Sequence, residues 1–173
     1  HVAGILGLLH TISNSVDKTS IEIYGPKDTK KKFNNLLSST YQNTMGNLDI
    51  KIKEIKATKL NTFYENEHYY LQAISLDHKV PALAYAFVEK DKRRLSTSKI
   101  KKLDLPHGPL LGKLQQGEDI IYKDKKYRYK DLTYTVKGKK IVVIMDTAYT
   151  KNTLEIAKDA DLLLAEATYL HKH

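Results

Sequence analysis

Lys139-Lys140-Ile141-Val142-Val143-Ile144-Met145-Asp146-Thr147 is the stretch of this sequence that decides the fold. Four branched apolar residues follow two lysines, and an acid and a threonine end the stretch. A short apolar run with almost no polar interruption predicts a β-strand buried on both faces. Asp146 then stands at the carboxyl end of that strand, where a loop begins. A lone aspartate at such a position is more simply a turn cap, so a functional role depends on its neighbours in space.

Three other polar residues favour a functional role for Asp146. His1, His78 and Glu166 each stand at the edge of a predicted strand or helix. The chain has no cysteine, so histidine, aspartate and glutamate are the strong metal ligands left to it. A carboxylate can also bridge two metal ions about 3.5–4 Å apart, which a histidine cannot do. Each signal is weak alone, because a single histidine is more often a surface or packed residue than a ligand.

Length and composition predict one globular domain. The chain has 173 residues, of which 41% are hydrophobic and 28% charged, enough for one sizeable core but small for two. No apolar run approaches the length of a membrane span and the first residues do not resemble a signal peptide, so we expect a cytoplasmic protein with no membrane partner. Since the chain opens on His1 without an initiator methionine, we expect an internal piece of a longer polypeptide.

The excess positive charge is concentrated in one segment. The net charge is +9, and residues 89–140 hold 16 basic against 7 acidic residues, which leaves the rest of the chain neutral. A charged run is usually a solvated face, but this segregation favours a polyanionic partner. The segment also has few large apolar residues for its length. Residues 89–138 are therefore expected to form an inserted, protruding basic arm with a small core of its own.

Periodicity and turn signals predict a mixture of helices and strands. Asn152 with Glu155 three residues later resembles a capping box for one of the helices. This succession is typical of an α+β or layered α/β domain. Helices are expected over 2–15, 29–37, 96–103, 110–114 and 152–160. Strands are expected over 20–24, 49–55, 69–76, 82–88 and, again buried, 161–166, with a hairpin over 120–129.

Six stretches form a series that is specific in order and spacing. They are HVAGILGLL at 1–9, IEIYGPKDTKKKF at 21–33, SLDHKVPALAYAFVEKD at 75–91, LPHGPLLGKLQQGE at 105–118, KGKKIVVIMDTAYT at 137–150 and AKDADLLLAEATYL at 157–170. The series resembles ribonuclease Z, a family of the metallo-β-lactamase superfamily, along nearly the whole chain. The resemblance implies a partial four-layer αββα fold, with residues 1–173 an internal part of a single domain and 89–138 an inserted tRNA-binding arm.

The resemblance also implies roles for single residues. His1 would bind the second zinc ion, His78 would complete the ligands of the first, and Asp146 would bridge both. Glu166 would orient a downstream histidine near the scissile phosphate, and the general-base aspartate of the family would precede His1. The remaining zinc ligands would likewise lie before His1 and beyond His173. Two departures, Met145 for a glycine and Ala165 for a histidine, fall on positions that are not zinc ligands in the family.

The activity implied by the resemblance is removal of the 3′ trailer from precursor tRNA by a zinc-dependent endoribonuclease. Two zinc ions per subunit would activate a hydroxide for attack on phosphorus, leaving a 3′-hydroxyl on the tRNA. In the family the arm reaches across a homodimer and grips tRNA bound at the partner subunit's site. The arm residues implied for tRNA binding are Arg93, Lys99, Lys101, Lys102, Gly108, Pro109 and Lys113.

Two other functions stay open at this stage. A generic metal-dependent phosphodiesterase of the same superfamily would act on small substrates, but it has no need of a +9 segment. A non-catalytic tRNA-binding homologue is kept open by Met145 and Ala165. Within the arm, Tyr122, Tyr127 and Tyr129 either stack on bases or, more simply, pack its small core.

Overall fold

The amino-terminal part of the chain is a helix followed by a parallel β–α–β unit. The computed structural model describes residues 3–40 and 46–166. The two strands pair in parallel from Thr19 opposite Leu48 to Gly25 opposite Glu54. Apolar residues of the helices and strands meet around buried Leu9 and Phe33. The elements are α1 (Ala3–Ser15), β1 (Thr19–Gly25), α2 (Thr29–Thr40) and β2 (Leu48–Glu54).

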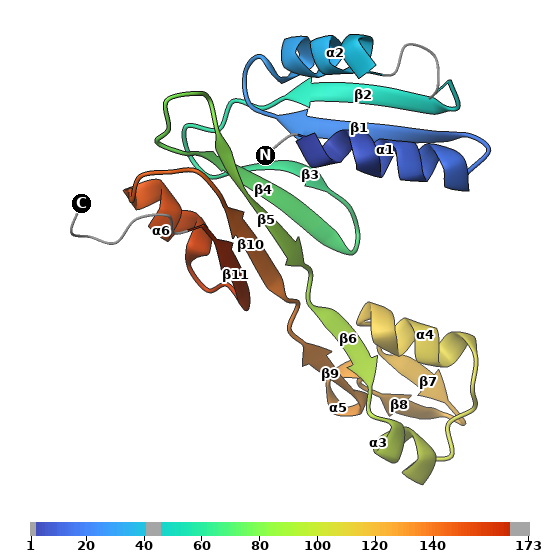
Figure 1. Cartoon of the computed structure of the whole chain (residues 1–173). Coiled ribbons are helices and arrows are strands. Elements are labelled where there is room, and N and C mark those ends of the chain that lie inside the picture. The colour runs from blue at the N-terminus through green and yellow to red at the C-terminus, as the bar shows by residue number, and fades with distance from the viewer. Residues whose placement is uncertain (1–2, 41–45, 167–173) are drawn as a thin grey trace.

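The central part is a five-stranded mixed sheet in the order β11-β10-β5-β4-β3. β10 runs antiparallel to β5 and parallel to β11. Helix α6 packs against the sheet (Figure 1). Its Ile156 belongs to a buried cluster that includes Ile74 and Val142 of the sheet. The elements are β3 (Asn61–Glu65), β4 (Tyr69–Ser75), β5 (Leu83–Glu89), β10 (Lys140–Ile144), α6 (Lys151–Ala157) and β11 (Leu162–Ala165).

A tyrosine contact joins the amino-terminal unit to the central sheet. The Tyr85 hydroxyl on β5 donates a hydrogen bond to the backbone oxygen of Tyr24 on β1, at 3.1 Å. The ring of Phe63 lies between them, with ring centroids 4.8 Å from Tyr24 and 6.1 Å from Tyr85. Burial raises the pKa of Tyr85 to about 12, so the phenol stays a neutral donor.

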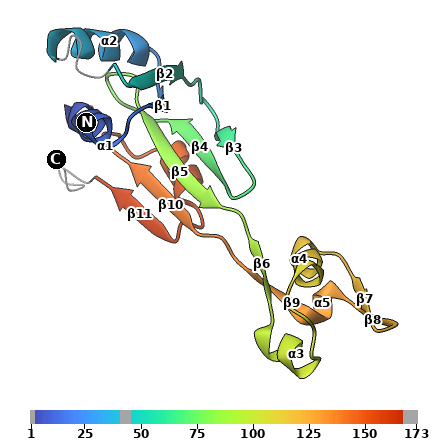
Figure 2. The same ribbon diagram turned by 90° about the vertical axis from the view of Figure 1, so that its right-hand side faces the viewer.

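Residues 90–139 form a lobe that stands apart from both sheets, and we call it the distal lobe (Figures 1 and 2). β6 and β9 form its stem, and its own core is built around Ile100, Leu111 and Leu114. Its elements are β6 (Lys92–Leu95), α3 (Thr97–Lys102), α4 (Pro109–Gln116), β7 (Ile120–Tyr122), β8 (Lys125–Tyr127), α5 (Tyr129–Leu132) and β9 (Thr133–Val136). The packing role of the tyrosines is confirmed, because Tyr122, Tyr127 and Tyr129 lie against this core.

The two strands that enter and leave the distal lobe touch at Gly138. The N–H of Glu89 donates to the backbone oxygen of Lys139 at 2.9 Å, and the N–H of Gly138 donates to Asp91 Oδ1 at 2.9 Å. A methyl group at Gly138 would overlap the backbone carbonyl of Glu89. The junction therefore requires a residue without a Cβ atom.

Gly138→Ala is expected to lower the free energy of unfolding by about 1–3 kcal/mol, because the backbone of β5 must move to admit the methyl group. Chemical denaturation followed by circular dichroism measures the change. Gly112→Ala is the matched control: a Cβ there meets nothing, and alanine in a helix is favoured over glycine by about 0.5–1 kcal/mol. Equal stability of the two variants would contradict a tight junction.

The structure corrects three local predictions. The strand β11 is exposed rather than buried, with Leu162, Leu163 and Leu164 48, 47 and 51% exposed, because it is the edge strand and pairs only with β10 among the described residues. β10 is buried on one face only, since Val142 and Ile144 are buried whereas Ile141 is 36% exposed.

The third correction concerns the start of α6. Its cap is Thr150, whose N–H donates to Thr153 Oγ1 at 3.2 Å, and the helix ends at Ala157. Asn152 does not cap the helix, because its amide donates to the backbone oxygen of Ser75 at 2.8 Å. The short strands β3, β6 and β9 were not predicted, since their pattern is set by pairing partners distant in sequence. None of the described helices is long and apolar enough to span a membrane.

Candidate active site

Three of the four predicted site residues lie in loops at one end of the strands of the central sheet. In the pairing register, Ser75 at the end of β4 lies opposite Leu83 at the start of β5, and Ile144 at the end of β10 lies opposite Ala165 of β11. The loops that carry His78, Asp146 and Glu166 therefore leave the sheet side by side. The distal lobe leaves the sheet at the other end of the strands, where Val88 pairs with Lys140.

Hydrogen bonds tie the His78 loop to the Asp146 loop. The N–H of Ala148 donates to the backbone oxygen of Asp77 at 3.0 Å, and Thr147 Oγ1 donates to the same oxygen at 3.4 Å. The residue before His78 is thus bonded to both residues that follow Asp146. These bonds fix two loops that the sequence separates widely, as a preformed site requires.

His78 and Asp146 both line one cavity of about 470 Å³. The central sheet supplies one wall, on which these two residues stand with Val143 and Met145. The amino-terminal unit supplies the other wall through Ile5 of α1, the turn between β1 and α2, and the apolar face of α2. A concave, largely apolar site with a few convergent polar groups is the usual form of a ligand pocket.

The chemistry of His78 and Asp146 fits part of a zinc site. An imidazole nitrogen and a carboxylate oxygen are both ligand types that zinc takes, but a zinc ion needs about four ligands or solvent positions. Within residues 3–40 and 46–166 no group of three or more such side chains gathers, and His1 lies outside these residues. Of the four predicted site residues, the described part of the chain therefore brings His78 and Asp146 to one cavity.

Glu166 follows β11 directly, next to the end of β10. Its N–H donates to the backbone oxygen of Ile144 at 3.1 Å, and the residue is exposed. Of the two departures from the family pattern, Met145 lines the cavity, whereas Ala165 lies within β11. Met145 is thus the departure that alters the cavity wall.

The residues predicted to bind tRNA fall into two groups. Arg93 and Lys99 have partners within the distal lobe: the Arg93 guanidinium lies 4.6 Å from the centroid of the Tyr129 ring, and Lys99 Nζ donates to the backbone oxygen of Asp131 at 2.8 Å. The other predicted residues are exposed on the lobe surface: Lys101, Lys102, Gly108, Pro109 and Lys113.

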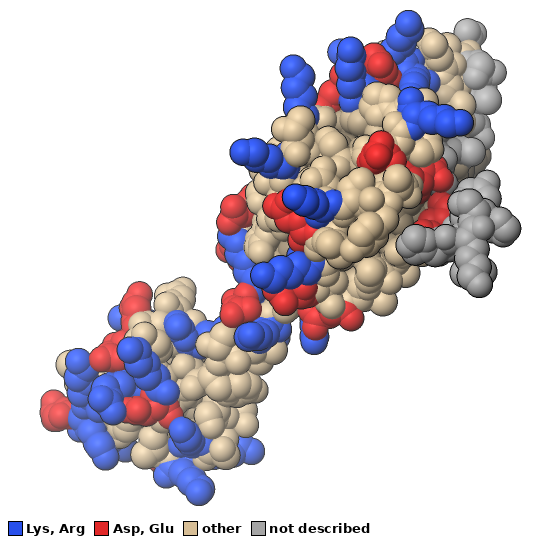
Figure 3. Space-filling model, turned by 90° about the vertical axis from the view of Figure 1, so that its left-hand side faces the viewer, with Lys and Arg blue, Asp and Glu red and all other residues tan. Residues whose placement is uncertain are grey.

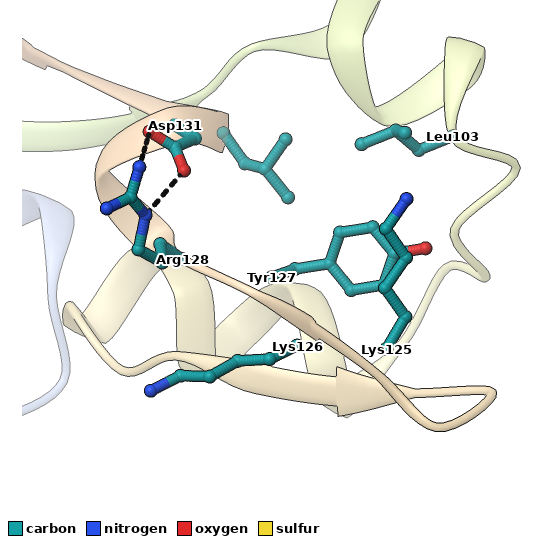
Figure 4. Close-up of a pocket in the computed structure, with 7 residues that line it drawn as sticks. Leu103, Lys125, Lys126, Tyr127, Arg128 and Asp131 are labelled. Atoms are coloured by element: carbon teal, nitrogen blue, oxygen red, sulfur yellow. Dashed lines mark hydrogen bonds and ion pairs between the residues drawn. The ribbon is translucent and has the colours of Figure 1, made fainter.

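A basic groove of the distal lobe was not predicted from the sequence (Figure 4). It has a volume of about 410 Å³ and is lined by Leu103 of the α3 end and by residues of the β8–α5 segment. Arg128 on its wall holds Asp131 through two hydrogen bonds of 2.8 and 3.3 Å. Figure 3 shows many Lys and Arg side chains on the face of the lobe that it presents.

Comparison with known proteins identifies relatives along the whole chain, although no protein-family model matches it. Ribonuclease Z of Nanoarchaeum equitans is 33% identical over 172 residues, which are 99% of this chain and 52% of the relative. The chain is homologous to ribonuclease Z. Ribonuclease Z of Brevibacillus brevis is 34% identical over 99% of this chain and 54% of its own length, and that of Thermococcus onnurineus is 34% identical over 98% and 53%. The chain spans about half the length of these relatives.

A solved structure supports the fold. Human tRNase Z, short form, superimposes with a TM-score of 0.50 at 17% sequence identity, covering 94% of this chain and 51% of that one. At this identity the likeness concerns the fold alone. It confirms the predicted mixed α/β class.

Proposed function

We propose that this chain is part of a zinc-dependent endoribonuclease that removes the 3′ trailer from precursor tRNA and leaves a 3′-hydroxyl on the tRNA. The observation that carries the proposal is the convergence of His78 and Asp146 on one cavity in a homologue of ribonuclease Z. Neither observation alone would suffice, because homology alone does not preserve a site and two polar residues alone do not define a reaction.

Each residue of the proposed site has a distinct task. His78 and Asp146 would hold zinc, and Asp146 has two carboxylate oxygens with which to reach two ions. Zinc held there would lower the pKa of water and so provide a nucleophile at neutral pH. The bonds from Thr147 and Ala148 to Asp77 keep the two ligand loops at a fixed separation. Glu166, one strand away from Asp146, would orient a histidine near the phosphate, and His1 would bind the second ion.

The charged distal lobe supports a large folded RNA as the substrate. Residues 89–140 carry the whole net positive charge, and lysine and arginine contacts to phosphates provide affinity without base specificity. The lobe leaves the sheet at the end of the strands that lies away from His78 and Asp146, so it does not cover the site of its own subunit. We therefore propose a homodimer in which each lobe grips tRNA bound at the partner subunit. A cytoplasmic location is part of the same proposal.

The partial four-layer αββα arrangement belongs to the same proposal. The α1–β1–α2–β2 unit and the central sheet with α6 would then be parts of the two halves of one metallo-β-lactamase domain, into which residues 89–138 are inserted as the tRNA-binding arm. The exposed leucines of β11 support continuation of the sheet beyond that strand.

A non-catalytic tRNA-binding homologue is the second candidate, and one observation favours it: Met145 stands on the cavity wall at a position where the family has glycine. A bulkier residue there narrows the space next to Asp146. The distal lobe argues against a generic phosphodiesterase of small substrates, since such an enzyme has no use for a basic lobe.

The deciding experiment incubates the full-length protein, loaded with zinc, with a precursor tRNA that carries a labelled 3′ trailer. We expect one cut at the trailer junction, a 3′-hydroxyl that poly(A) polymerase can extend, and loss of cleavage when a chelator removes the metal. Tight binding without cleavage would favour the non-catalytic homologue. Hydrolysis of bis(p-nitrophenyl) phosphate without any cleavage of tRNA would favour the generic phosphodiesterase.

A further inference from the structure

Two lysines of the amino-terminal unit stand in the same cavity as His78 and Asp146. Lys27 of the β1–α2 turn and Lys32 of α2 line the wall of the amino-terminal unit, whereas His78 and Asp146 lie on the wall of the central sheet. In the described part of the chain, neither lysine forms an ion pair. Two cations without an ion pair among the described residues therefore line the cavity that holds the proposed metal ligands.

Hydrogen bonds within the protein fix the β1–α2 turn, which carries Lys27 and leads into the helix of Lys32. Both the N–H and the Oγ1 of Thr29 donate to the backbone oxygen of Pro26, at 3.2 and 2.7 Å. The N–H of Ile55 donates to the backbone oxygen of Gly25 at 2.8 Å, and Tyr85 holds Tyr24 from the central sheet. Because the turn is held from both sheets, the backbone that carries the lysines is fixed before a ligand binds, which lowers the entropic cost of binding.

Lysines at this place are unfavourable in the unliganded protein. The first turn of α2 reads Thr29-Lys30-Lys31-Lys32 and contains no acid, although the amino end of a helix is the positive end of its dipole. Two acids offset part of this charge: Asp28 directly precedes the helix, and the Glu54 carboxylate accepts a hydrogen bond from the N–H of Lys30 at 3.0 Å. An anion in the cavity would offset the rest, since helix amino ends favour negative charge.

We propose that Lys27 and Lys32 bind the sugar-phosphate backbone of single-stranded RNA next to the scissile bond. The inference rests on the proposed function and adds positioning residues to it. Metal ions held by the sheet wall would face the scissile phosphate, and the lysines on the other wall contact its neighbours. Lysine acts as a point charge, so this contact is independent of base sequence.

The test compares two double variants of the full-length zinc-loaded protein. K27A/K32A removes the two lysines that line the cavity. K30A/K31A removes the same charge from two exposed residues in the first turn of α2 that do not line the cavity. Three quantities are measured: kcat and KM for precursor tRNA over a range of salt concentrations, hydrolysis of bis(p-nitrophenyl) phosphate, and the unfolding temperature without RNA.

For K27A/K32A we expect kcat/KM on precursor tRNA to fall about 10-fold or more, and the slope of its logarithm against log salt to fall by about 1.4, or about 0.7 for each lost single-strand phosphate contact. Hydrolysis of the small phosphodiester stays within about twofold. The unfolding temperature stays equal or rises, because an unfavourable charge is removed. K27R/K32R is expected to restore most of the tRNA activity.

Equal tRNA kinetics and salt slopes for the two double variants would overturn the proposal. A lowered unfolding temperature with parallel loss of both substrates would also overturn it, since that result indicates a structural role. If the unsubstituted protein does not cleave precursor tRNA, the proposed function fails separately. The lysine proposal is then decided by anisotropy with a short single-stranded RNA: weaker binding by K27A/K32A alone supports it, and equal binding by both double variants refutes it.

Discussion

Asp146→Ala in the full-length, zinc-loaded protein is expected to lower kcat/KM for precursor tRNA by at least about 100-fold. The reason is the carboxylate itself, because no other predicted ligand of this chain is assigned to two metal ions at once. If Asp146 bridges two ions as proposed, its loss would remove one ligand from each ion, so zinc content per subunit should fall together with activity. Hydrolysis of bis(p-nitrophenyl) phosphate should fall to the same extent, since both reactions use the same ions.

Asp159→Asn is the matched control for this experiment. Asp159 precedes β11, at the end of the strands that lies away from Asp146. Its backbone is left-handed (φ 56°), a conformation that asparagine tolerates. Its substitution removes the same charge and should leave zinc content and both activities unchanged. An Asp146→Ala protein that keeps its zinc and cleaves at the rate of the control would contradict the metal-bridging role.

Removal of the distal lobe is expected to abolish precursor-tRNA processing, by about 1,000-fold or more, and to spare hydrolysis of a small phosphodiester within about twofold. The loss follows from the many phosphate contacts given up at once, each of which depends on salt. The structure shows where to cut: β5 and β10 are antiparallel neighbours, with Val88 opposite Lys140, so a two-residue Asn-Gly turn can replace residues 90–138. The core of the lobe is separate from that of the sheet.

A charge-reversed lobe is the control for this deletion. Lys101→Glu with Lys102→Glu and Lys113→Glu alters exposed residues only and keeps the lobe core intact. This variant should lose tRNA processing in large part while the small phosphodiester is still hydrolysed at the normal rate. If the deletion abolishes both activities but the charge-reversed variant abolishes neither, the lobe is a structural support and not a tRNA-binding arm.

Much of the fold could be predicted because the signals are local. Apolar periodicity predicted α1, α2 and most of the paired strands, and the Lys123–Asp124 turn of the β7–β8 hairpin lies where the sequence predicts it. Helix α6 was predicted from a capping-box pattern at Asn152 and Glu155, although its cap is Thr150. Burial was predicted less well. The run Leu162-Leu163-Leu164 looks buried by composition, yet exposure depends on which strand lies beside it, and β11 is an edge strand here.

Side-chain partners were likewise beyond the sequence. Arg93 reads as a free cation in a basic segment, but it packs on Tyr129 and against Gly117, residues that the fold of the lobe brings to it. Lys27 and Lys32 read as a charged helix start, and only the packing of two sheets turns them toward the cavity of His78 and Asp146.

The sequence by itself determined the succession of helices and strands, the basic segment, and the residue types able to hold a metal ion, because periodicity, charge and ligand chemistry are properties of neighbouring residues. The tertiary structure alone decided that His78 and Asp146 share a cavity and that two lysines line its other wall. It also decided that the distal lobe leaves the sheet at the other end of the strands. Those relations depend on strand order and register, which are set by contacts between residues far apart in the chain.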